Sequence, residues 1–153
     1  MNETAGSTAK VERPERTANY TGPRTDTSRW AAYEPREGDI FICTPPKCGT
    51  TWTQAICALL IFRRRDFRGQ LDTISPWFDS TGVPLDTCVR TLAAQSHRRF
   101  IKTHTPLDAV PYRDDATYLA VYRDPRDAFF SMRSHLKNAA SAQAIPQTDP
   151  DPK

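Results

Sequence analysis

The chain has 153 residues, of which 38% are hydrophobic and 13 are proline, so its length fits one domain with a modest core. The formal net charge of +3 is too small to indicate nucleic-acid binding by itself. No apolar run approaches the ~18 residues of a membrane-spanning helix, and no signal pattern opens the chain, so we expect a cytoplasmic protein without a transmembrane segment.

The two ends of the chain differ in composition from its middle. Residues 1–28 are polar without apolar periodicity, which predicts a flexible N-terminal arm. Residues 143–153 are predicted to form a polar, proline-rich tail, which leaves residues 29–142 as the folded domain. The cysteines have neither metal-ligand spacing nor the pattern of a disulfide framework, and they favour a reducing compartment. They are Cys43, Cys48, Cys57 and Cys88.

Apolar patterns in the middle of the chain predict helices and strands in alternation. In chain order we expect a short helix at 28–33, a strand at 40–43, a loop at 44–49, a helix at 50–63, an irregular segment at 64–84, a helix at 86–94, a strand at 99–103, a loop at 106–115, a strand at 117–122 and a helix from 124 to about 138. This order predicts an α/β fold, with a P-loop-like parallel sheet flanked by helices. Ligands of such sheets bind at the carboxyl ends of the strands, where three polar clusters fall.

The first polar cluster connects the first strand to the first long helix. It reads Thr44-Pro45-Pro46-Lys47-Cys48-Gly49-Thr50-Thr51-Trp52. A Gly-containing loop at a helix N-terminus binds anions through free backbone N–H groups and the helix dipole, and Lys47 adds a full positive charge. Because the Lys precedes the Gly and the first Gly of the Walker pattern is missing, this is not a standard P-loop. The alternative is an ordinary strand-to-helix turn with a capping Thr.

The second cluster is the strand end at residues 100–104. Alternation along a strand places Lys102 and His104 on the same face. A neutral His accepts a proton near pH 7, and a neighbouring cation helps to keep it neutral, so His104 is a candidate general base. The alternative is a structural His at the end of a strand.

The third cluster, residues 122–127, follows the third strand. Arg123 at the strand end and Ser131 about two turns into the next helix could together hold a phosphate by charge-assisted hydrogen bonds. The alternative is an Asp-Pro helix cap surrounded by surface charges, since Asp124 suits a cap and Pro125 suits the first helical position.

Together the three clusters resemble the cytosolic-type sulfotransferase family, whose donor is 3′-phosphoadenosine 5′-phosphosulfate. The donor loop of that family reads approximately T-Y/A-P-K-S-G-T-T-W and is similar to residues 44–52. Its K-T-H motif is similar to residues 102–104, and its R-N/D-P-K/R-D motif followed by Ser is similar to residues 123–127 and Ser131. Residues 73–79 also look similar to bacterial members called glycolipid sulfotransferases.

The resemblance implies a role for each matching position. Lys47 would stabilise charge on the leaving oxygen of the donor, Lys102 would help to hold the sulfuryl group, and His104 would be the general base on the acceptor hydroxyl. The acceptor would be an alcohol, a phenol or a glycolipid, and neither a metal nor a nucleic acid is implied. The implied donor-binding residues are Lys47, Cys48, Gly49, Thr50, Thr51 and Trp52 around the phosphosulfate and adenine, with Arg123 and Ser131 on the 3′-phosphate.

Two departures from the family pattern leave alternatives open. Cys48 stands where the family has Ser, and it is either an oxidation-sensitive thiol at a helix N-terminus or a tolerated small side chain. Family members are about twice as long as this chain, so we expect an incomplete sheet with an open edge. A non-catalytic, nucleotide-binding remnant is therefore an alternative. A P-loop kinase is a weaker one, because residues 118–122 offer no Walker-B Asp.

Overall fold

The computed structural model describes residues 15–64 and 70–144. Half of the predicted arm, residues 1–14, and most of the predicted tail, residues 145–153, lie outside the described residues. The boundaries of the arm and the tail therefore stay predictions. Within the described part of the arm, the backbone N–H of Thr17 donates to the carbonyl of Asp108 at 2.9 Å.

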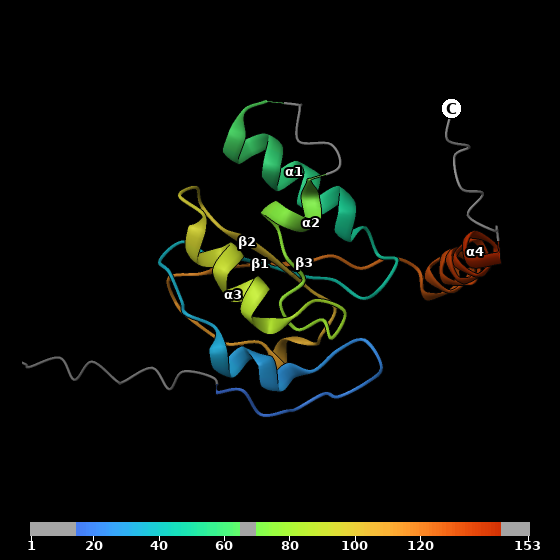
Figure 1. The fold of residues 1–153 in the computed structure, drawn as a ribbon, viewed down its shortest axis with the longest axis horizontal. Coiled ribbons are helices and arrows are strands. Elements are labelled where there is room, and N and C mark those ends of the chain that lie inside the picture. Colours follow the sequence, from blue (N-terminus) through green and yellow to red (C-terminus); the bar gives the residue numbers. More distant parts are fainter. Residues whose placement is uncertain (1–14, 65–69, 145–153) are drawn as a thin grey trace, which may run out of the picture.

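The elements follow the predicted alternation of helices and strands (Figure 1). They are η1 (Thr27–Ala32), β1 (Ile40–Cys43), α1 (Thr50–Phe62), α2 (Leu71–Ile74), α3 (Leu85–Ala94), β2 (Phe100–Thr103), η2 (Leu107–Ala109), β3 (Thr117–Ala120) and α4 (Pro125–Ala144), where η marks a 3-10 helix.

The three strands form one parallel sheet in the order β2-β1-β3, which confirms the predicted α/β fold. The central strand β1 is buried along its whole length, as its unbroken apolar run predicts. Cys43 at the end of β1 pairs with Thr103 at the end of β2 and with Ala120 at the end of β3. All three strands therefore end at one edge of the sheet.

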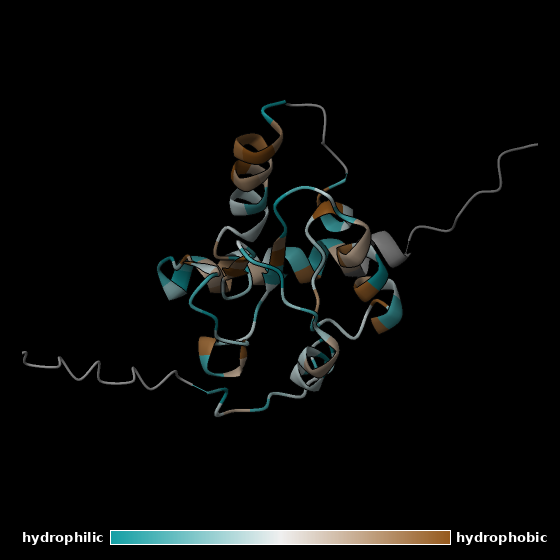
Figure 2. Ribbon diagram, turned by 90° about the vertical axis from the view of Figure 1, so that its left-hand side faces the viewer, coloured by the Kyte–Doolittle hydropathy of each residue, from teal (hydrophilic) through white to brown (hydrophobic). Residues whose placement is uncertain are grey.

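Helices cover both faces of this sheet (Figure 1). On one face Phe41 packs with Trp30 of η1 and Leu92 of α3. On the other face Ile42 packs with Ala58 of α1, and α2 adds partly buried side chains. Figure 2 shows the apolar strands at the centre of the molecule, between these two layers.

The structure differs from the predicted elements at several boundaries. The third strand ends at Ala120 and not at residue 122, because β1, its partner in the ladder, ends at Cys43. The last helix runs to Ala144 and not to about residue 138, since its final residues are mostly Ala, the strongest helix former. The irregular segment contains the single turn α2, and the predicted loop at 106–115 contains η2.

One side of the molecule stays open among the described residues. The outer side of β3 has no strand partner there, so the sheet ends in the open edge that the sequence predicts. Figure 1 shows α4 standing apart from the sheet. Large apolar side chains of α4 and α1 are exposed on their own helices, namely Phe129, Phe130, Leu136, Trp52 and Leu60.

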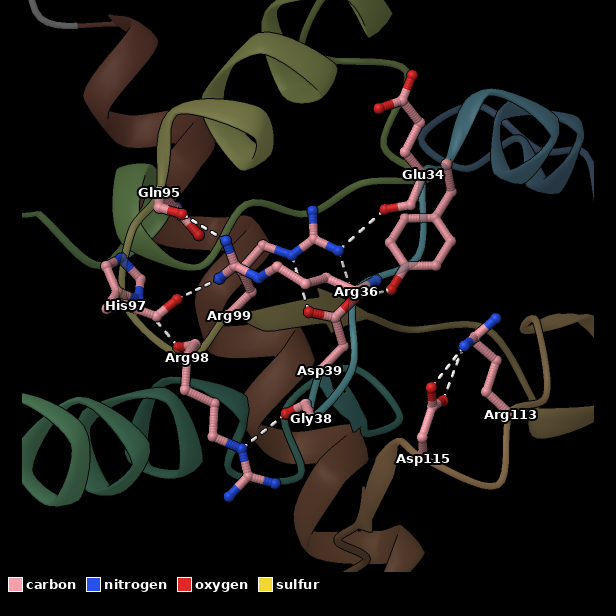
Figure 3. Close-up of polar contacts among 11 residues, drawn as sticks. Glu34, Arg36, Gly38, Asp39, Gln95, His97, Arg98, Arg99, Arg113 and Asp115 are labelled. Atoms are coloured by element: carbon pink, nitrogen blue, oxygen red, sulfur yellow. Dashed lines mark hydrogen bonds and ion pairs between the residues drawn. The ribbon is translucent and has the colours of Figure 1, made fainter.

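A buried ion pair joins β1 to β2 at the end of the sheet opposite to the polar clusters (Figure 3). Arg99 donates from Nε to Oδ1 of Asp39 at 2.8 Å and from Nη2 to Oδ2, and the two residues are 4% and 0% exposed. The Tyr33 hydroxyl also donates to Oδ2 of Asp39. Burial and this neighbouring carboxylate raise the pKa of Tyr33. Asp39 thus receives donors at both of its oxygens.

Two further arginines complete this polar end of the sheet (Figure 3). The Arg36 guanidinium donates to the backbone carbonyls of Gln95 and His97. Arg98 donates from Nε to the carbonyl of Gly38 at 2.6 Å. The turn before β1 and the segment before β2 are therefore tied together by side-chain bonds to backbone.

Asp39→Asn should destabilise the fold by about 3 kcal/mol, because it leaves the Arg99 guanidinium buried without a counter-charge. Urea unfolding followed by circular dichroism would measure this loss. The control is Asp86→Asn, which breaks the exposed Asp86–Arg90 pair of α3 and should cost less than about 1 kcal/mol. Equal losses in the two variants would contradict an anchoring role for Asp39.

Candidate active site

The parallel sheet brings the three polar clusters to one edge. Thr44 directly follows β1, and its carbonyl oxygen accepts a 2.7 Å hydrogen bond from Nδ1 of His104, which directly follows β2. Arg123, beyond the end of β3, donates from Nη1 to the carbonyl of Lys47 at 3.3 Å. The first cluster therefore contacts both of the others. Their coincidence is as predicted, whereas the roles of the individual residues stay predictions.

The loop between β1 and α1 is held in an uncommon backbone conformation. Lys47 has a φ of 66° and Gly49 has a φ of 104°, both in the left-handed region that disfavours side chains. The Thr44 and Thr50 hydroxyls hydrogen-bond to each other across the loop. The N–H of Cys48 donates to the carbonyl of Pro45 at 3.2 Å. A non-Gly residue held at positive φ in a loop before a helix N-terminus is typical of a functional loop.

The N-terminus of α1 is free to receive an anion. Gly49 is its N-cap, so no Thr side chain caps the helix, and the ordinary strand-to-helix turn stays an alternative. The first N–H groups of a helix have no intrahelical acceptor, and the first turn of α1 carries no acidic residue. Thr51 and Trp52 in this turn are exposed, and Trp52 is 78% exposed.

The His104 ring is held in one neutral tautomer. A carbonyl oxygen only accepts, so Nδ1 must carry the proton in the bond to Thr44, and Nε2 keeps its lone pair in the neutral ring. Burial lowers the pKa of His104 from its usual range; the bond to Thr44 acts against this effect and the charge of Lys102 adds to it. The ring is thus oriented and available to take a proton at Nε2.

Lys102 and His104 share an aromatic neighbour, Trp77. The Lys102 Nζ lies 5.1 Å from the centre of the Trp77 ring, and the His104 ring meets Trp77 edge-on with centroids 4.7 Å apart. Burial lowers the pKa of Lys102. Of the other aromatic residues nearby in sequence or on α4, Phe78 lies in the core and Phe130 is exposed.

The third cluster divides into a cap and a cation that contacts the loop. Asp124 accepts from the N–H of Arg126 at 2.9 Å at the start of α4, as a helix cap does. Arg123 instead contacts the carbonyl of Lys47 and lies 3.5 Å from the Asp127 carboxylate. Ser131 lies about two turns into α4 and is half-buried, and no hydrogen bond joins it to Arg123 in the part of the chain that the structure describes.

All four cysteines are buried and free of disulfide bonds. Cys48 in the loop is only 6% exposed, which favours a packed small side chain over an oxidation-sensitive thiol. Among residues 15–64 and 70–144, no three His, Cys, Asp or Glu side chains gather as metal ligands. No helix in the same ranges has the length and apolar character needed to cross a membrane.

Comparison with known proteins supplies the family. The sulfotransferase domain family matches residues 37–150. The chain belongs to the sulfotransferase family. A glycolipid sulfotransferase of Mycobacterium tuberculosis is 51% identical over 113 residues, which are 74% of this chain and 35% of the relative. An amine sulfotransferase of Oryctolagus cuniculus is 30% identical over 112 residues, covering 69% of this chain and 35% of the relative.

This sulfotransferase chain spans about a third of the length of the curated relatives it matches. A solved structure of retinol dehydratase in a complex with retinol and PAP aligns with a TM-score of 0.52 at 23% identity. The alignment covers 68% of this chain and 41% of that one. At this identity the likeness supports the sulfotransferase fold alone.

The lowered pKa of His104 predicts how stability depends on pH. Below the usual value of 6.5 the unfolded chain takes up a proton that the buried ring resists, so stability falls as pH drops through 6.5 and returns as pH rises. His104→Gln should flatten this slope between about pH 5 and pH 7, measured by urea unfolding. His135→Gln, at an exposed position of α4, is the matched control, and an equal flattening there would contradict the assignment.

Proposed function

We propose that this chain forms the donor-binding part of a sulfotransferase that transfers a sulfuryl group from 3′-phosphoadenosine 5′-phosphosulfate to a hydroxyl. The carrying observation is the convergence of the α1 N-terminus, Lys47 and His104 at the carboxyl edge of the sheet. An alcohol, a phenol or a glycolipid would supply the hydroxyl. The glycolipid is supported by the 51% identity to a mycobacterial glycolipid sulfotransferase.

The donor fits the loop by charge and by hydrogen-bonding capacity. In the proposed complex, the free N–H groups and hydroxyls around Thr50 and Thr51 hold the 5′-phosphosulfate. Arg123 and Ser131 serve the 3′-phosphate, and exposed Trp52 offers a ring to the adenine. The PAP bound in the retinol dehydratase structure supports a donor of this chemistry. No metal is needed in this arrangement.

The proposed transfer needs a base on one side of the sulfur and a cation on the other. Nε2 of His104 takes the proton of the acceptor hydroxyl while the hydroxyl oxygen attacks the sulfur. The bond from sulfur to the phosphate oxygen breaks, and Lys47 stabilises the charge that this oxygen gains. Lys102, held by Trp77 beside His104, stabilises the sulfuryl oxygens between the two.

A second candidate function is a non-catalytic domain that binds the nucleotide without turnover. One structural observation fits it: among the residues that the structure describes, the outer side of β3 has no strand partner. We further propose action in the cytoplasm on a small-molecule or glycolipid acceptor, and not on nucleic acid. The four unpaired cysteines support a reducing compartment.

Calorimetry with adenosine 3′,5′-bisphosphate tests donor binding. Arg123→Ala should weaken binding about tenfold or more, because a hydrogen bond to a charged group contributes roughly 1.5–3 kcal/mol. Arg126→Ala is the matched control, since its exposed guanidinium pairs with Asp124 beside the same strand end. The absence of binding by the wild type, or equal effects of the two substitutions, would sink the proposed donor site.

A sulfuryl-transfer assay with a phenol and with a glycolipid separates the two candidate functions. His104→Ala should lower the rate about 10²-fold or more, the usual contribution of a general base, while leaving donor binding unchanged by calorimetry. A wild type that binds the bisphosphate but transfers to neither acceptor would favour the non-catalytic domain. Full activity of His104→Ala would show that His104 is not the base.

A further inference from the structure

Asp79 is a buried carboxylate beside the candidate active site that the mechanism above does not use. It follows the segment of Trp77 and is 0% exposed. Its Oδ2 accepts hydrogen bonds from the hydroxyls of Thr103 at 2.7 Å and Thr105 at 2.5 Å. Its Oδ1 is equally buried, and no partner for it exists among the residues that the structure describes. A buried oxygen without a donor is costly, so its retention calls for an explanation.

The two threonines that Asp79 holds stand on either side of His104. The N–H of Thr105 also donates to the hydroxyl of Thr103 at 3.0 Å, which closes a small ring of bonds around this strand end. Side chains alternate along an extended segment, so the threonines point to one side while His104 points to the other. Fixing both neighbours fixes the backbone of His104, and the bond to Thr44 then orients its ring.

Asp79 is itself rigidly placed. The segment before it runs parallel to β2: Lys102 donates its N–H to the carbonyl of Pro76 at 3.0 Å, and Phe78 donates its N–H to the carbonyl of Lys102 at 3.4 Å. The N–H of Asp26 donates to the carbonyl of Asp79 at 2.8 Å. Backbone hydrogen bonds of Phe78 and of Asp79 itself therefore fix the position of the Asp79 carboxylate.

Two cations and one carboxylate influence the pKa of His104. The ring is packed against Trp77, and the cations Lys102 and Arg24 both act to lower the pKa of His104. Asp79 is the carboxylate that acts to raise it. A His that takes a proton beside two cations gains a charge in an unfavourable field, and a nearby carboxylate offsets that cost. Among the described residues, no donor engages Oδ1 of Asp79, so one of its two oxygens is left without a hydrogen bond.

We propose that Asp79 is a positioning residue, which holds the two threonines around His104 and stabilises the charge that the imidazole gains when it takes a proton. The catalytic role of Asp79 rests on the proposed function. The interaction between the charges of Asp79 and His104, here called the Asp79 coupling, needs neither donor nor acceptor to be present.

The test is a titration of His104 by NMR in the full chain, with the histidine signals assigned from His→Gln variants. Asp79→Asn keeps the shape and an acceptor oxygen for the threonines but removes the charge, so the pKa of His104 should fall further. The control is Asp86→Asn, an exposed carboxylate on α3, which should leave it unchanged. A folded Asp79→Asn protein with the wild-type pKa at His104 would overturn the proposal.

A second measurement needs no substitution at Asp79. The side-chain carboxyl carbon of Asp79 should shift in the wild type as His104 titrates, with the same midpoint, and this step should disappear in His104→Gln. A featureless carboxyl signal across the titration of His104 would also overturn the coupling. Neither result depends on turnover, so an inactive chain would disprove the proposed function while leaving the Asp79 coupling measurable.

Discussion

The buried pair of Asp39 and Arg99 is the interaction on which the rest of the structure depends. It joins the residue before β1 to the residue before β2, and both charges lie in the interior, where their mutual contact and further hydrogen bonds offset the cost of burial. A slip of one residue between the two strands would break this pair and turn every side chain to the wrong face. The register that starts at Asp39 also sets Thr44 beside His104 at the other end.

The polar groups at one end of the sheet stabilise the fold, whereas those at the other end are available to a ligand. At the amino ends, Asp39 receives donors at both oxygens, and the arginines around it find carbonyl acceptors. At the carboxyl ends, polar groups lack partners among the residues described: the α1 N-terminus has no side-chain cap, no hydrogen bond engages Nε2 of His104, and Oδ1 of Asp79 receives no donor. Groups without internal partners are those that a ligand or a proton can engage.

The features that could be predicted from the sequence are those that a local residue pattern determines. The apolar run of β1 and the alternation of Lys102 and His104 predicted the parallel sheet and the shared edge, because period and strand direction are local properties. The pairing of Asp39 with Arg99 joins residues 60 positions apart and left no local signal. Asp79 was missed for the same reason, since its partners Thr103 and Thr105 lie beyond a helix. Tertiary contacts alone show which polar residues are buried.

The parts of the candidate site differ in how firmly the described fold holds them. His104 and the loop depend on β1 and β2, which are paired, covered on both faces and anchored at Asp39. Arg123 follows β3, an edge strand with half-exposed residues, and contacts the loop through one 3.3 Å bond to Lys47. A 3′-phosphate held by Arg123 in the proposed complex would tie this open edge to the loop. Donor binding would then stabilise the side of the sheet where the chain itself supplies the least packing.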